Sequence, residues 1–75
     1  MKAERRSAIN EVVGELEKAV TKLEELKDLE QKDLDALPED MEFSDEESEL
    51  EDAIDDLSYA IEDLQTAIES IKKVK

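Results

Sequence analysis

The amino-acid sequence predicts an all-α protein, an antiparallel two-helix hairpin. Three observations carry this prediction. Apolar residues recur at alternating steps of three and four, a proline-containing segment interrupts them near the middle, and charged residues make up 45% of the chain. Such steps are the period of a helix that buries one face. One Gly, one Pro and 3% aromatic residues also argue against a compact mixed fold.

The second half of the chain has the clearer pattern and predicts a helix over about 45–73. Ile and Leu follow each other there at steps of four and three, and an alanine at every seventh residue widens the apolar stripe. Ser44 and Glu47 have the spacing of a capping box at the start of this helix. Lys72 and Lys73 at its end suit the negative pole of the helix dipole.

The first half predicts a helix over about 3–36. Its apolar stripe is regular as far as Leu23, but Lys27 and Glu30 occupy the next two inward positions. We therefore expect the stripe to move to Leu26 and to continue in Leu34 and Leu37, through a local change of helical period.

The segment 37–44 is expected to form the corner between the helices. Pro38 restricts the backbone of Leu37 and ends the first helix. Met41 and Phe43 are the apolar residues expected to fold back and fill the corner. A connection of this length permits an antiparallel hairpin.

Two helices shield only part of each other's apolar stripes, so we expect two hairpins to pair as a homodimeric four-helix bundle. A single hairpin docked on another protein is the alternative. The residues expected to form the oligomer core are Val13, Leu16, Val20, Leu23, Ile54, Leu57, Ile61, Leu64 and Ile68.

The formal net charge is −14, and no Lys or Arg occurs from Asp33 to Ile71, where sixteen acids lie. This surface should repel nucleic acid and anionic membranes. The expected partner is instead a basic protein surface, for example that of a nucleic-acid-binding host protein. Ten acids from Asp45 to Asp63 give about one charge per 2.8 Å of helix, against about one per 1.7 Å for duplex DNA.

Catalytic and metal-binding chemistry has few candidates in this sequence. It contains no His, no Cys and no Gly-rich phosphate loop, so we expect no enzyme, no cofactor and no metal site. We also expect no membrane-spanning segment, because no apolar run approaches the required length. A chain without cysteine fits the cytoplasm.

Acids that face away from the predicted core of the second helix are the candidate contacts for a partner. Tyr59, the only tyrosine, is expected to be exposed among them and to act as an apolar anchor. The candidate partner-binding residues are Glu49, Asp52, Asp55, Asp56, Tyr59, Glu62 and Asp63.

The corner and the repeats that follow it resemble a family of small acidic helical-hairpin proteins of phages and prophages. The family pattern E-Q-x-x-x-D/N-x-L-P-E corresponds here to Glu30, Gln31, Asp35, Leu37, Pro38 and Glu39, and repeated A-I-x-x-L units follow Leu50. Asp35 and the residues after Glu39 depart from the forms that the family often shows. The resemblance implies a phage or prophage origin, and so the host cytoplasm, but no particular activity.

Two functional hypotheses follow. The first is a non-enzymatic protein-binding module, and specifically a phage-derived inhibitor that occupies the nucleic-acid-binding surface of a host defence protein. The alternative is a structural coiled-coil or bundle adaptor whose acidic surface serves only solubility.

Overall fold

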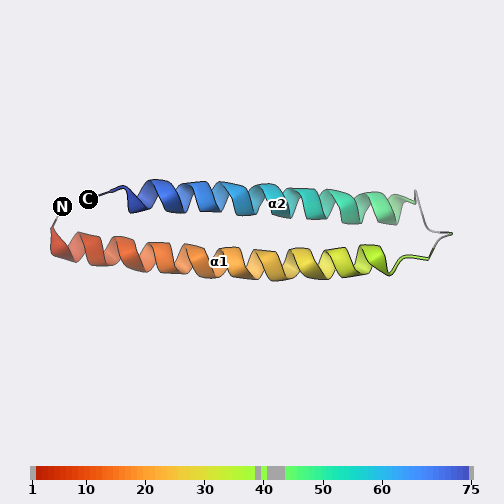
Figure 1. Ribbon diagram of the computed structural model, residues 1–75, viewed down its shortest axis with the longest axis horizontal. Coiled ribbons are helices and arrows are strands. Elements are labelled where there is room, and N and C mark those ends of the chain that lie inside the picture. The colour runs from red at the N-terminus through yellow and green to blue at the C-terminus, as the bar shows by residue number, and fades with distance from the viewer. Residues whose placement is uncertain (1, 39, 41–43, 75) are drawn as a thin grey trace.

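The computed structural model describes residues 2–38, 40 and 44–74, and it shows two antiparallel helices lying side by side (Figure 1). Helix α1 spans Ala3–Asp35 and helix α2 spans Asp45–Lys72. All four bounds lie within one residue of the expected positions. The prediction of an all-α hairpin is therefore confirmed.

The hairpin is a thin rod, 60 × 15 × 12 Å in extent. The start of α1 and the end of α2 lie together at one end of the rod, which we call the base, and the end of α1 and the start of α2 lie at the other end, which we call the tip (Figure 1). Neither helix in the described part of the chain combines the length and apolar character needed to cross a bilayer.

Local signals set the helix ends at the tip. Ser44 is the N-cap of α2, and its side-chain oxygen accepts a hydrogen bond of 3.2 Å from the backbone N–H of Glu47. At the end of α1, the backbone N–H of Ala36 donates to the carbonyl of Lys32 at 3.0 Å. Pro38 follows two residues after this C-cap and prevents the helix from continuing.

The core is one seam of side chains between the helices. Val13 and Val20 of α1 and Ile61 and Ile68 of α2 are buried, with exposed fractions of only 7–9%. Apolar residues that are half-buried pack against them: Ile9, Leu16, Leu23, Leu64 and Ile71. No residue in 27–38 or in 44–57 is buried to this extent, so the core lies toward the base and the middle of the rod.

The course of the α1 stripe after Leu23 differs from the prediction at Leu26, whereas Leu34 and Leu37 are half-buried as expected. Leu26 is 51% exposed, whereas Lys27 and Glu30 are half-buried on the face toward α2. The regular steps of four and three therefore continue through two charged residues. A straight helix keeps its phase, so the positions fixed by Val13 and Val20 decide which residues face α2 further along.

The expected filling of the corner by Met41 and Phe43 lies outside the described residues. Of the nine residues expected to form the oligomer core, four are buried and the other five are half-buried within a single hairpin.

Replacing Gly14 by alanine should stabilise the protein. A Cβ atom built at this position meets no atom within 4 Å, and glycine inside a helix is about 1 kcal/mol less favourable than alanine. We expect the midpoint of thermal unfolding, followed by circular dichroism, to rise by about 4–8 °C. An unchanged or lower midpoint would show that this stretch of α1 does not need helical backbone.

Replacing Glu30 by leucine should extend the seam toward the tip. The half-buried carboxylate would give way to an apolar side chain, and we expect the free energy of unfolding in urea to rise by about 1 kcal/mol. Glu25→Leu is the matched control, because Glu25 is exposed on the same helix and loses the same charge. Equal effects of the two substitutions would mean that Glu30 does not face α2.

Candidate functional site

The predicted partner-binding residues gather on one strip of α2. Each of the seven is exposed, and each occupies a helical position turned away from the seam of core residues. We call this strip the outer acidic face, and its residues are Glu49, Asp52, Asp55, Asp56, Tyr59, Glu62 and Asp63. It runs for about 21 Å along α2 at a rise of 1.5 Å per residue.

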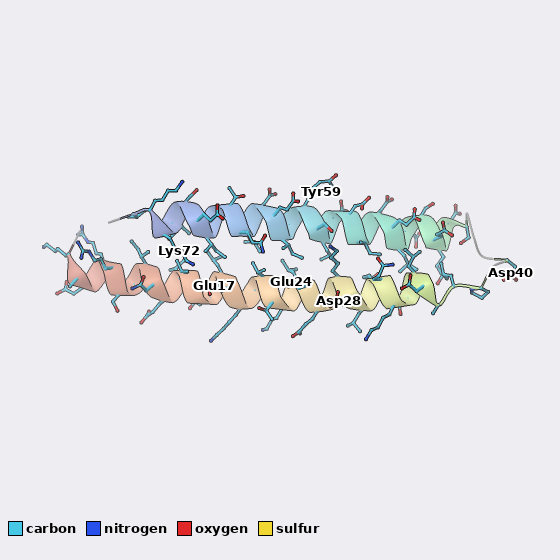
Figure 2. The ribbon with its side chains drawn as sticks, viewed as in Figure 1. Glu17, Glu24, Asp28, Asp40, Tyr59 and Lys72 are labelled. Carbon is cyan, nitrogen blue, oxygen red and sulfur yellow. The ribbon has the colours of Figure 1, made fainter. Side chains whose placement is uncertain are left out.

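Tyr59 lies at the centre of the outer acidic face. Its side chain is 65% exposed and points away from α1 (Figure 2). In a helix, the nearest surface neighbours of a residue lie three and four positions away. For Tyr59 all four of these neighbours are acids, namely Asp55, Asp56, Glu62 and Asp63. The ring therefore projects from a surround of carboxylates.

The carboxylates of this face have no cationic neighbour on their own helix until its last turn. Lys72 is the basic residue in that turn, and it forms an ion pair across to α1, where its Nζ lies 3.5 Å from Oε1 of Glu17. In the described part of the chain, none of the seven face residues makes an ion pair or a side-chain hydrogen bond. Their negative potential is directed at the solvent.

The Glu17–Lys72 pair bridges the two helices toward the base (Figure 2). Next to it is an open depression with core residues at its floor. The depression is lined by Glu17, Val20, Gln65, Ile68, Glu69 and Lys72. Its lining combines the core residues Val20 and Ile68 with side chains from both helices, so it has the character of the groove between two helices.

The acids of the chain are numerous but do not form a metal-binding arrangement in the part that the structure describes. In residues 2–38, 40 and 44–74, no three carboxylates converge on a point that could hold a metal ion. On a helix surface the acids of the outer face radiate outward, because successive side chains are turned by about 100°. Such an arrangement suits an extended cationic surface better than a single ion.

Two residues of the corner pattern described above interact with each other. The side-chain amide of Gln31 donates a hydrogen bond of 3.0 Å to the carboxylate of Asp35, one turn later on α1. This pair is exposed and spans the last turns of the helix, so its evident role is to hold the end of α1.

Sequence reasoning missed one surface feature, a set of exposed apolar residues on α1. Val12 is 45% exposed, Leu26 is 51% exposed and Leu29 is 55% exposed. The heptad pattern could have identified Val12 and Leu26 as exposed apolar residues, because they lie beside the seam positions and two heptads apart. For Leu26, the apolar side chain led to an inward assignment that the phase of the helix does not allow.

Comparison with known proteins finds no matching protein family, no similar curated protein and no similar solved structure.

Proposed function

We propose that this protein is a non-enzymatic binding module that docks on a basic protein surface through the outer acidic face of α2. The observation that carries the proposal is Tyr59 with its four acidic neighbours. An arginine or lysine of a partner can stack on the exposed ring and reach a carboxylate one helical turn away on either side.

The charge of the chain defines the class of partner. With a net charge of −14, the surface repels nucleic acid and is attracted to the basic surfaces that nucleic-acid-binding proteins present. In its narrower form, the proposal is a phage-derived inhibitor that occupies such a surface on a host defence protein in the cytoplasm. The narrower form rests on the resemblance of the corner segment to phage and prophage proteins.

Pairing of two hairpins into a homodimeric four-helix bundle is part of the proposal. The hairpin exposes 5943 Å², whereas a compact monomer of 8.5 kDa exposes about 4,700 Å². The surplus, about 1,200 Å², is what one protomer loses in a large dimer interface. The radius of gyration, 17.4 Å, likewise exceeds the roughly 11 Å of a compact chain of this length.

A structural adaptor is the second candidate function, and the exposed apolar residues of α1 favour it. Val12, Leu26 and Leu29 are large side chains in water, and a partner helix would cover them. In that case the acids would serve only solubility. Charge reversal on α2 would then leave partner binding unchanged, and Leu26→Asp would abolish it.

Reversing the charge at the centre of the outer acidic face should abolish docking. We expect Asp55→Lys/Asp56→Lys to capture far less of a basic partner from host lysate than the unchanged protein does. Glu24→Lys/Glu25→Lys is the matched control, because it makes the same change in net charge on exposed positions of α1. The Glu24→Lys/Glu25→Lys control should still capture the partner at 0.1 M NaCl. At 0.5 M NaCl its capture should fall, because salt screens the attraction between exposed charges. Duplex DNA added to the complex should release the partner.

Equal capture by both double variants, at both salt concentrations, would contradict the docking proposal. Loss of capture with both variants to the same extent would mean that only the overall charge matters, and not the outer acidic face. Circular dichroism should show the same helical content in all three proteins, so that unfolding does not explain a difference.

Removing the ring at position 59 should weaken the same complex. We expect Tyr59→Ala to raise the dissociation constant by about tenfold, the loss of roughly 1.4 kcal/mol, because exposed aromatic anchors carry much of the binding energy in such interfaces. Tyr59→Phe keeps the ring and should bind within about twofold of the unchanged protein. If Tyr59→Ala binds as well as Tyr59→Phe, the ring takes no part in docking.

A further inference from the structure

The two broad sides of the hairpin differ in chemistry. The Glu17–Lys72 ion pair joins positions that flank the seam on one side, so this side of α1 lies next to the same side of α2. The positions one and two heptads closer to the tip are also polar. They are Glu24 and Gln31 on α1 and Gln65 and Ser58 on α2. We call this the polar side of the hairpin.

The opposite side is apolar along the middle of the rod. The residues that flank the seam there recur at every seventh position on both helices. They are Val12, Ala19 and Leu26 on α1 and Ala53, Ala60 and Ala67 on α2. We call this set the apolar side. Leu29, 55% exposed, lies at its margin, where it extends the surface that Leu26 begins.

We propose that a second copy of this chain covers the apolar side, and that it runs in the opposite direction, so that the tip of each hairpin lies beside the base of the other. This inference rests on the homodimer proposed above and not on docking to a basic partner. It adds which side forms the interface and how the two rods are oriented.

The apolar side is suited to another helix pair. Its alanines let backbones approach closely, while Val12 and Leu26 supply larger side chains that are half-exposed in the single hairpin. The charged residues of the same heptad series, Arg5 and Asp33 on α1 and Glu46 on α2, lie beyond the ends of the set. The centre of this side is therefore uncharged, which matches the depletion of charge in the centre of protein interfaces. A two-fold axis uses the same patch on both copies and closes the assembly at two.

Charge decides the direction of the second copy. Residues 1–19 and 59–75, the half of the rod toward the base, contain seven bases and seven acids. Residues 20–58, the half toward the tip, contain three bases and seventeen acids, and therefore hold the whole net charge of −14. Parallel rods would place two such halves side by side. Antiparallel rods place each acidic half against a neutral one, which removes most of that repulsion.

The spacing of the apolar side is compatible with the antiparallel direction. Ala19 is the middle residue of α1, and Val12 and Leu26 lie seven residues before and after it. A two-fold axis near Ala19 brings the two alanines together at the centre and sets Val12 of one copy opposite Leu26 of the other. Tyr59 points away from α1 on the outer acidic face, so this packing leaves the ring exposed (Figure 2).

Distances between spin labels test the inference on the full chain. The protein contains no cysteine, so Ser7→Cys and Thr21→Cys each accept one nitroxide per protomer. Both residues are exposed, and they lie two heptads apart on the same strip of α1. Ser7 is near the base and Thr21 is near the middle of the helix. Pulsed electron paramagnetic resonance then gives one distance for each labelled dimer.

In the antiparallel dimer the two Ser7 positions are displaced by about 36 Å along the rod, and the two Thr21 positions by only about 6 Å. We expect the Ser7 distance to exceed the Thr21 distance by at least about 15 Å. Similar distances at the two sites, with a mass of two protomers, would overturn the antiparallel direction and leave the homodimer standing.

Light scattering of the unlabelled protein and of two variants tests the interface itself. We expect a dimer for the unchanged chain, a monomer for Leu26→Glu, and a dimer for Tyr59→Glu, which adds the same charge off the apolar side. A dimeric Leu26→Glu protein would overturn the assignment of the interface. A monomeric unchanged chain at micromolar concentration would overturn the inference and the homodimer together. Docking to a basic partner would be unaffected by that result.

Discussion

The structure depends on a single seam of apolar side chains between two helices. Val13 and Val20 on one helix and Ile61 and Ile68 on the other are the buried residues of the described chain, and every further packed residue is arranged around them. Two helices have one line of contact, so a chain of this architecture cannot enclose its side chains from all directions. The thin rod, the large exposed surface and the exposed valine and leucines of α1 all follow from this constraint.

The seam also weakens from the base to the tip. Toward the base it is apolar on both helices, whereas beyond the middle α1 contributes Lys27 and Glu30. The same part of the rod holds the whole net charge, so the acidic half of the molecule is also the half with the less apolar interior. Mutual repulsion of the acids and the polar residues in the seam both favour local opening there. The tip is thus the part of the hairpin that gains most from a neighbouring surface of opposite or neutral charge.

The two proposed contacts of this protein use different surfaces. Docking to a basic partner would use the outer acidic face of α2, where Tyr59 is surrounded by acids. Pairing with a second copy would use the apolar side, where valine, leucine and alanine flank the seam. Because the two surfaces lie on different sides of α2, one contact leaves the other accessible. Four helices paired in this way would present two outer acidic faces on one molecule, and a partner with two basic sites would then bind by avidity.

The sequence by itself determined the two helices, their bounds and the exposure of Tyr59. Those features depend on local signals: the heptad spacing of Ile and Leu, the cap at Ser44 and the restriction imposed by Pro38. Only the tertiary structure decided that Leu26 faces solvent while Lys27 and Glu30 face α2. Side-chain polarity favours the opposite assignment, but a rigid helix packed through Val13 and Val20 has no freedom to turn Leu26 inward. The exposure of Leu26 was thus set by the packing of residues about two and four turns away on the same helix.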